Sequence, residues 1–273
     1  MYKIIVSDLD ETLLTTDDKS VSEANRAAIK AVREMGVRFV PASGRGFRSM
    51  DKTLKELGLY DLPEEYVISF NGGAITENRG NRVLHFQGIP FSTAEELYRR
   101  GFQYDVCVHV YTIDTVYVSN FVSWEREFLQ GRMEVTEIHE KNLDFLKGQE
   151  IVKCLYMNTD HAYLTRIADE LSGVTGDMDV SYSSNRYLEF NQKGVNKGSG
   201  LRKLAELLGV DMKDTIAIGD NYNDLTMIQA AGLGVGVANT VEEMKPLCDY
   251  VTAADCNHGA VAEVLHKFVL RDW

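Results

Sequence analysis

Residues 4–12 read IIVSDLDET, an apolar run that ends in two aspartates separated by a single residue. Because side chains alternate along a strand, we expect Asp8 and Asp10 to project from the same side at its carboxyl end. Two like charges about 4 Å apart repel each other by roughly 4 kcal/mol at an effective dielectric near 20. Such a pair is typical of a site that holds a divalent cation, or of a nucleophilic carboxylate beside a carboxyl group that donates a proton.

The same rhythm of a short apolar strand, a polar turn and an amphipathic helix returns in the first and last thirds of the chain. Residues 23–35 follow the 3.6-residue period of a helix, and Gly36 is placed to end it. Near-continuous apolar strands that alternate with helices predict an α/β fold, a parallel sheet covered on both faces. The predicted strands are 4–7, 37–42, 66–70, 215–218 and 234–237.

The middle third has a different character. It is rich in aromatic residues, with strand-like alternation at 107–111 and 115–118 and a helical pattern at 163–171. These features predict a second, mixed α+β domain inserted into the first. We therefore expect a core domain formed by 1–83 and 189–273, and an inserted domain formed by 84–188.

Length and composition bound the class of protein. A chain of 273 residues exceeds the usual size of a single core, and 44% hydrophobic and 26% charged residues are typical of soluble globular proteins. A formal net charge of -12 without a Lys/Arg-rich stretch argues against a nucleic-acid or anionic-membrane surface. Widely spaced cysteines, no basic-then-apolar leader and no long apolar run favour a cytoplasmic location.

Four polar clusters follow the predicted strands or open the helix after them. In open α/β sheets, ligands bind at the edge formed by the carboxyl ends of the strands, so these clusters are candidates for one site. They are residues 8–12 (DLDET), 43–45 (SGR), 194–198 (GVNKG) and 219–224 (GDNYND).

Each cluster also has a purely structural interpretation. Acids are favourable near helix N-termini, and serine is a common N-cap residue. Lys197 falls in the first turn of a predicted helix, where the macrodipole disfavours a cation by a few tenths of a kcal/mol up to about 1 unless an anion compensates. The joint order and spacing of the four clusters favours a shared function over four independent structural roles.

The motifs DLDETLL, ASGR, NGGAI, LEFNQKGVNKG and GDNYNDLTM, in this order and with the insert in its place, resemble the haloacid dehalogenase (HAD) superfamily of phosphohydrolases. The chain is most similar to the Cof-type branch with a type IIB cap. The resemblance implies a Rossmann-like, doubly wound parallel-sheet core with an inserted α+β cap (C2, type IIB) that determines substrate specificity. It spans nearly the whole chain.

Carried over by motif, the resemblance implies a role for each cluster. Asp8 matches the nucleophile that forms an aspartyl-phosphate, Asp10 the general acid/base, and Lys197 the cation that holds nucleophile and phosphate together. The implied phosphate-binding residues are Leu9, Ser43, Gly44, Lys197 and Asn223. The implied Mg²⁺ ligands are Asp8, the backbone carbonyl of Asp10, Asp220 and Asp224, the last directly or through water.

One position departs from the family pattern. Glu11 stands where the family usually has glycine, at a backbone turn that supplies no chemical group. A residue with a Cβ there could shift the loop, which bears on the rate rather than on the reaction type.

The resemblance implies a Mg²⁺-dependent phosphatase that hydrolyses small phosphomonoesters, such as sugar phosphates or phosphorylated cofactors like pyridoxal phosphate or FMN. The alternatives are a phosphosugar mutase of the phosphomannomutase type and a non-catalytic module that binds a phosphorylated metabolite. The complete set of Asp8, Asp10, Lys197 and Asp220 argues against the second. The expected partner is a small phosphorylated metabolite, with no nucleic acid and no membrane, and the chain is expected to be a monomer or homodimer.

Overall fold

The computed structural model describes residues 1–131 and 133–271. The chain forms two compact units, one from Met1–Phe86 together with the chain from Asn196 onward, and one from Gln87–Val195. The boundaries expected at 84 and 188 fall inside the strands β5 (Arg82–Phe86) and β11 (Tyr187–Gln192). Each strand stays whole within the sheet of its own unit, because its hydrogen-bonding partners lie there. The connections between the units therefore follow these strands.

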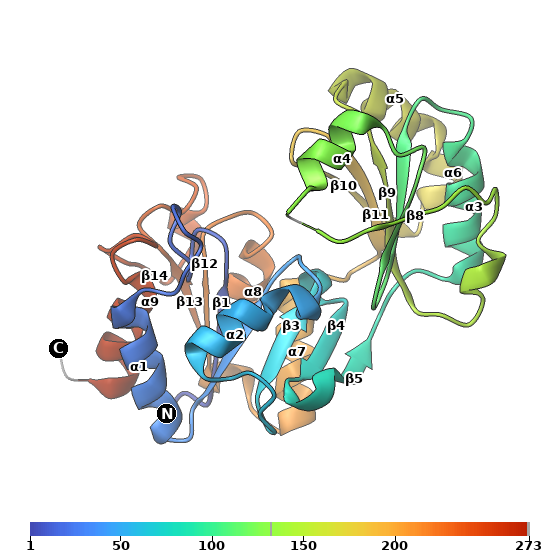
Figure 1. The fold of residues 1–273 in the computed structure, drawn as a ribbon. Coiled ribbons are helices and arrows are strands. Elements are labelled where there is room, and N and C mark those ends of the chain that lie inside the picture. Colours follow the sequence, from blue (N-terminus) through green and yellow to red (C-terminus); the bar gives the residue numbers. More distant parts are fainter. Residues whose placement is uncertain (132, 272–273) are drawn as a thin grey trace. The chain divides into compact units, whose positions relative to one another are not determined.

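The first unit is built on a sheet with the order β14-β13-β12-β1-β2-β3-β4-β5 (Figure 1). Strands β14 to β3 in this order pair in parallel, and β3, β4 and β5 pair antiparallel. The bounds are β1 (Ile4–Asp8), β2 (Arg38–Ala42), β3 (Tyr66–Ser69), β4 (Ala74–Glu77), β12 (Thr215–Gly219), β13 (Leu233–Gly236) and β14 (Tyr250–Val251). The five predicted strands are the parallel ones at the centre.

Helices cover both faces of this sheet. The first predicted helix is α1 (Glu23–Glu34), which begins at the N-cap Ser22 and ends where Gly36 adopts a φ of 81°. On one face, Ile4 and Val6 of β1 pack with Leu201 and Leu204. The alternate residue Ile5 is also fully buried, which is the pattern of a strand covered on both sides. The other α-helices of this unit are α2 (Asp51–Leu57), α7 (Lys197–Leu208), α8 (Leu225–Ala230) and α9 (Ala260–Leu265).

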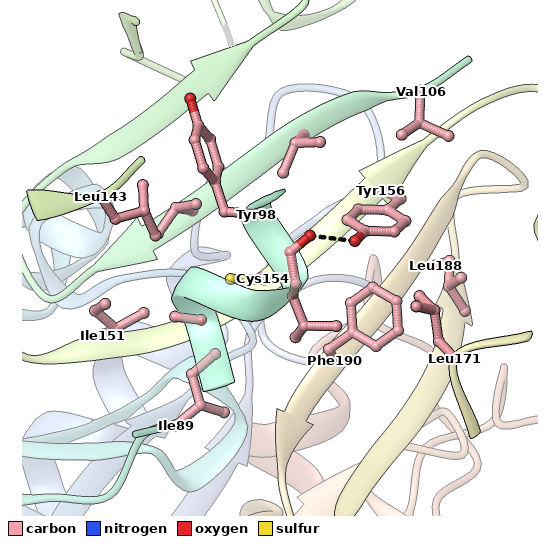
Figure 2. Close-up of a cluster of buried hydrophobic side chains, with 14 of the residues drawn as sticks. Ile89, Tyr98, Val106, Leu143, Ile151, Cys154, Tyr156, Leu171, Leu188 and Phe190 are labelled. Carbon is pink, nitrogen blue, oxygen red and sulfur yellow. Dashed lines mark hydrogen bonds between the residues drawn. The ribbon is translucent and has the colours of Figure 1, made fainter. Parts of the chain in front are cut away.

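The second unit is an α+β insert with its own core. Its sheet has the order β10-β11-β9-β6-β7-β8, and all pairs except β7–β8 are antiparallel. Figure 2 shows the core between this sheet and its helices, where Tyr156 donates a hydrogen bond to the carbonyl of Leu97. The remaining α-helices and strands are α3 (Phe91–Gly101), β6 (Cys107–Thr112), β7 (Val116–Ser119), α4 (Ser123–Leu129), β8 (Thr136–Glu137), β9 (Ile151–Met157), α5 (His161–Glu170), α6 (Ser172–Thr175) and β10 (Met178–Ser183).

The register of the strands brings the predicted site residues to the same edge of the first sheet. Ser7 pairs with Ile218 of β12, and Asp8 pairs with Ala42 of β2. The carboxyl ends of three neighbouring strands therefore lie level with one another. Within the described ranges, no helix is long and apolar enough to cross a membrane.

Candidate active site

A cavity of about 310 Å³ opens at the carboxyl ends of β1, β2 and β12. Three of the four predicted clusters contribute to its wall, and the fourth supplies Lys197 beneath it, as the switch-point rule for α/β sheets predicts. The lining residues are Asp8, Asp10, Glu11, Ser43, Gly44, Arg45, Asp220, Asn221 and Asn223.

A larger cavity of about 510 Å³ lies near the two chain ends, lined by Met1, Tyr2, Lys213, Asp214 and Phe268 among others. Asp214 immediately precedes β12, so this cavity belongs to the amino-terminal side of the strands. None of the predicted site residues lines it. We therefore place the candidate site in the smaller cavity, because the residues that line it matter more than the size of the larger one.

Lys197 is fully buried and lies between two aspartates. Its ammonium group donates a hydrogen bond to Asp8 Oδ1 and another, 2.5 Å long, to Asp224 Oδ1. Burial lowers the pKa of Lys197, but the two carboxylates outweigh burial and raise it. The helix dipole disfavours a lysine in the first turn of a helix unless an anion compensates. The carboxylates of Asp8 and Asp224 are these compensating anions.

Asp224 closes the loop that follows β12. Its Oδ2 atom accepts hydrogen bonds from the backbone N–H groups of Asp220 (3.0 Å) and Asn221 (3.1 Å). The close approach requires glycine at position 219, because a Cβ there would lie 2.4 Å from the Asp224 Cβ. Both carboxylate oxygens of Asp224 are therefore occupied, one by the loop backbone and one by Lys197.

Asp220 is held by Thr12, a residue that was not among the predicted site residues. The hydroxyl of the fully buried Thr12 donates a 2.5 Å hydrogen bond to Asp220 Oδ1. The DxDxT spacing could have indicated a role for Thr12 in the site, since Thr12 lies on the same loop as the two aspartates. The hydrogen bond joins the loop after β1 to the end of the neighbouring strand β12 and restrains the Asp220 side chain.

Asp8, Asp220 and Asp224 form a buried acidic cluster, with one oxygen from each lying within 4.8 Å of the others. Burial raises the pKa of Asp8 to about 8, although Lys197 lowers it, and burial raises the pKa of Asp220 to about 6, although the Thr12 hydrogen bond lowers it. Three carboxylates share one lysine, so the cluster lacks positive charge. Its all-oxygen donor set is the kind that Mg²⁺ prefers.

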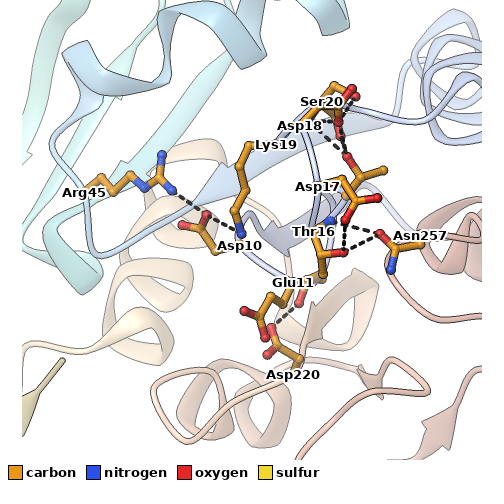
Figure 3. A network of polar contacts seen from close by, with 12 residues as sticks. Asp10, Glu11, Thr16, Asp17, Asp18, Lys19, Ser20, Arg45, Asp220 and Asn257 are labelled. Carbon is orange, nitrogen blue, oxygen red and sulfur yellow. Dashed lines mark hydrogen bonds and ion pairs between the residues drawn. The ribbon is translucent and has the colours of Figure 1, made fainter. Parts of the chain in front are cut away.

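Asp10 lies on the open side of the cavity, with 38% of its side chain exposed. The guanidinium of Arg45 donates a hydrogen bond to Asp10 Oδ1, and Lys19 Nζ lies 3.9 Å from the same oxygen (Figure 3). The two aspartates of the opening motif thus lie in different environments. Asp8 is buried in contact with Lys197, whereas Asp10 is exposed between two cations. Separate environments suit separate chemical roles.

The second cluster forms a turn stabilised by Asn71. The carbonyl of Ser43 accepts from the backbone N–H of Asn71 (2.9 Å), and the Ser43 hydroxyl accepts from the N–H of Arg45 (3.1 Å). A Cβ on Gly44 would lie 3.2 Å from the Asn71 amide nitrogen, and Asn223 donates to the amide oxygen of Asn71 at 3.4 Å. The NGGAI motif therefore contributes Asn71, a bridging residue that was not among the predicted site residues.

Glu11, which stands where the family usually has glycine, lies in the turn after Asp10. This residue has a φ of 62°, in the left-handed region that favours glycine. Its carbonyl accepts a 2.7 Å hydrogen bond from the side chain of Asn239. Leu9 is buried in the same turn, with its carbonyl accepting from the N–H groups of Leu13 and Leu14. The chain keeps the backbone conformation in spite of the Cβ.

Comparison with known proteins identifies the family of this chain. The family model described as haloacid dehalogenase-like hydrolase matches residues 5–265. YxeH of Bacillus subtilis (strain 168), which carries a provisional phosphatase name, is 30% identical over 279 residues and the match covers 99% of each chain. The 5-amino-6-(5-phospho-D-ribitylamino)uracil phosphatase YcsE of the same organism is 27% identical over 272 residues, covering 98% of this chain and 96% of that one.

The crystal structure of a haloacid dehalogenase-like hydrolase from Bacteroides thetaiotaomicron is similar over 98% of this chain and 99% of that one, with 30% identity and a TM-score of 0.84. The α/β fold and the family that the motifs indicated are thereby confirmed. Because the relatives over the whole length are named as phosphatases, the catalytic class is confirmed as well. The chain is an enzyme that belongs to the haloacid dehalogenase-like hydrolases, in their Cof-type branch.

Proposed function

We propose that the protein is a Mg²⁺-dependent phosphatase that hydrolyses small phosphomonoesters through an aspartyl-phosphate on Asp8. The observation that carries the proposal is the contact of Asp8 with Lys197 at the wall of the strand-end cavity, beside the carboxylates of Asp220 and Asp224. Phosphoryl transfer asks a protein mainly for positioning and for compensation of charge. A buried nucleophilic carboxylate with a fixed cation supplies both.

The donor set supports Mg²⁺ as the cofactor. The ligands we assign are the carboxylates of Asp8 and Asp220 and the backbone carbonyl of Asp10. For Asp224, the occupied oxygens favour an indirect role, in which it holds Lys197 and the loop that carries Asp220. When bound, the ion offsets negative charge on the phosphoryl group and on the crowded acids.

The residues divide the chemistry into two steps. A carboxylate oxygen of Asp8 attacks phosphorus, the ester P–O bond breaks, and Asp10 gives a proton to the departing oxygen. Water then attacks the phosphorus while Asp10 takes its proton, the bond to Asp8 breaks, and inorganic phosphate is released. The non-reacting phosphoryl oxygens are assigned to the turn of Ser43 and Gly44. Leu9 (through its N–H), Lys197 and Asn223 complete this set.

The decisive experiment is phosphate release from p-nitrophenyl phosphate with Mg²⁺, comparing the protein with its Asp8→Asn variant. Loss of the nucleophile should lower kcat by about 10³-fold or more. Asp17→Asn is the matched control, because Asp17 is an exposed acid on the following loop. Normal turnover by a folded Asp8→Asn variant would refute the nucleophile. Chelation by EDTA should abolish the activity, and added Mg²⁺ should restore it.

For the substrate we propose sugar phosphates or phosphorylated cofactors such as pyridoxal phosphate or FMN, selected by the inserted unit. Support comes from the small cavity and from a relative named for a phosphorylated ribitylamino-uracil. A screen of phosphorylated metabolites tests this assignment. Product analysis with a hexose 1-phosphate separates hydrolysis from a mutase, which would return an isomer without free phosphate, and tight binding without release would indicate a non-catalytic module.

A further inference from the structure

The turn that follows β3 contacts three of the four polar clusters, and none of its residues has a part in the proposed chemistry. It consists of residues 70–72, and we call it the β3 turn. Its backbone N–H groups donate to two carbonyls of the second cluster, those of Ser43 (2.9 Å) and Arg45 (3.0 Å). One of its side chains contacts Asn223 of the fourth cluster, and the turn packs against the amino end of α7, where the third cluster lies.

The backbone of the β3 turn is strained. Phe70 and Asn71 have φ angles of 53° and 52°, in the left-handed region that residues with a Cβ seldom adopt. Asparagine tolerates this region better than most residues, whereas a bulky residue such as phenylalanine is rarely found there. Strain of this kind gathers at functional sites, where the surrounding structure holds it. Here the hydrogen bonds to the second cluster and the packing on α7 hold it.

Two glycines allow the β3 turn to approach α7. A Cβ on Gly72, which has a φ of 99°, would lie 2.2 Å from the carbonyl oxygen of Asn196. A Cβ on Gly200 would lie 2.9 Å from the Cα atom of Gly72. Asn196 is the N-cap residue of α7 and immediately precedes Lys197. The turn therefore packs directly on the end of the helix that carries the catalytic lysine.

The amide of Asn71 lies between two groups that we assign to the phosphate. Its nitrogen and oxygen would lie 3.2 Å and 3.3 Å from a Cβ on Gly44, and its oxygen accepts a 3.4 Å hydrogen bond from Asn223 Nδ2. Asn223 and Gly44 line the cavity, whereas Asn71 does not. Asn71 is therefore placed to hold these groups and not to touch a substrate.

The hydrogen bond from Asn223 to Asn71 decides which end of the Asn223 amide is the nitrogen end. An asparagine amide has two N–H donors on its nitrogen and an acceptor on its oxygen, and the two ends exchange places when the amide turns over. One N–H of Asn223 is bound to Asn71 Oδ1. Within the described residues, the second N–H has no other partner, so it is available to a phosphoryl oxygen. The reversed amide would place its carbonyl oxygen there, which repels a phosphate.

We propose that Asn71 is a positioning residue, which orients the amide of Asn223 so that this side chain donates to the transferred phosphoryl group. The inference rests on the proposed function, in which Asn223 contacts that group. The β3 turn holds the second, third and fourth clusters together through its backbone and its glycine. The side chain of Asn71 then fixes the direction of one phosphate-binding amide.

The test is the variant Asn71→Gly, alone and combined with Asn223→Ala. Glycine adopts a φ of 52° without strain, so the backbone hydrogen bonds of the turn are kept while the amide is removed. The readouts are the dissociation constant of inorganic phosphate with Mg²⁺, from calorimetric titration, and kcat/KM for p-nitrophenyl phosphate. Asn71→Gly should weaken phosphate binding and lower kcat/KM by about tenfold each, the lower end of the effect of a hydrogen bond to a charged group.

The double variant separates an effect through Asn223 from an independent structural effect. In the Asn223→Ala background, Asn71→Gly should change either quantity by less than about twofold, because no amide is left to orient. Thermal unfolding of each variant establishes that it is folded.

Asn81→Gly is the matched control. Asn81 also has a left-handed backbone, with a φ of 51°, and lies in the turn between β4 and β5. This turn is at the opposite edge of the sheet from the cavity, because Glu77 at the end of β4 pairs with Tyr66 at the start of β3. The control substitution should leave phosphate binding and kcat/KM unchanged.

Two results would overturn the inference. Unchanged phosphate binding and turnover in Asn71→Gly would show that the amide of Asn71 has no role, and an equal loss with and without the Asn223 side chain would show that it does not act through Asn223. Failure of the proposed function has a different signature. A protein that binds phosphate without hydrolysing p-nitrophenyl phosphate is not a phosphatase, and the phosphate titration still tests Asn71. Absence of both binding and turnover in the unaltered protein would remove both proposals.

Discussion

The hydrogen bond from Thr12 to Asp220 allows a specific prediction about metal binding. Thr12→Val replaces the hydroxyl with a methyl group of nearly the same volume, so the packing around this fully buried residue is kept. The variant removes a 2.5 Å bond to the carboxylate that we assign as a Mg²⁺ ligand. We expect weaker Mg²⁺ binding with little change in kcat once the metal saturates the site.

The magnitude follows from the bond that is lost. A hydrogen bond to a charged group contributes about 1.5–3 kcal/mol, which corresponds to a rise of about one to two units in the pKa of Asp220. This pKa is already raised to about 6. Because the bond favours the charged carboxylate, its loss moves the pKa upward, to near or above neutral pH. A proton then competes with Mg²⁺, and the loss of an orienting partner typically costs about 10–100-fold in metal affinity.

The assay is a Mg²⁺ titration of phosphate release at pH 7 and at pH 9, supported by calorimetric titration of the ion. The Mg²⁺ concentration for half activity should rise by about 10–100-fold at pH 7 and by less at pH 9, where the carboxyl group is again ionised. Thr12→Ser keeps the hydroxyl and serves as the matched control. Equal Mg²⁺ dependence of the valine variant and the unaltered protein at pH 7 would refute the reasoning.

Three further predictions concern buried charge and strained backbone. Lys197→Met removes the cation that two buried carboxyl groups, Asp8 and Asp224, share, and should lower the free energy of unfolding at pH 7 by about 3–5 kcal/mol in urea denaturation; an unchanged value would show that these contacts do not stabilise the fold. Glu11→Gly relieves the left-handed residue and should raise the melting temperature by about 2–4 °C, whereas Glu11→Ala, which keeps the Cβ, should not. Burial raises the pKa of Glu263, but hydrogen bonds from Tyr250 and two backbone N–H groups outweigh it and hold this pKa below its usual range. A depressed carboxyl pKa stabilises the fold above the unfolded value and loses this effect as the pH falls, so Glu263→Gln should destabilise at pH 7 and by progressively less below about pH 4.

Much of the core could be predicted because its signals are local. The parallel strands are continuous apolar runs, and each ends at the polar cluster that its sequence shows directly, as with Ile4 to Asp8. Once the strands are placed in one parallel sheet, their carboxyl ends must share an edge, so the convergence of Asp8, Ser43 and Asp220 follows from the fold class. The position of Lys197 at the start of a helix is likewise a local pattern.

The contacts that the sequence did not reveal join residues far apart in the chain. Thr12 and Asp220 are 208 positions apart, and Arg45 lies 35 positions from Asp10. Threonine and arginine are common in loops, and no local pattern states which carboxylate each will meet. The limits of the inserted unit depend on pairing in the same way, because only the pairing of β11 with β9 assigns this strand to the second sheet.

The order of the strands has a consequence for synthesis of the chain on the ribosome. Asp8 is made 189 residues before its lysine, and the neighbouring strand β12 follows later still. The inserted unit, which is contiguous, is complete before either arrives. The first strands are therefore made before their neighbour β12, and the candidate active site can form only after the last third of the chain has been synthesised. Because pairing of β12 with β1 closes this long span, we expect docking of β12 to be a late step in folding, and we expect a chain stopped before Thr215 to be inactive.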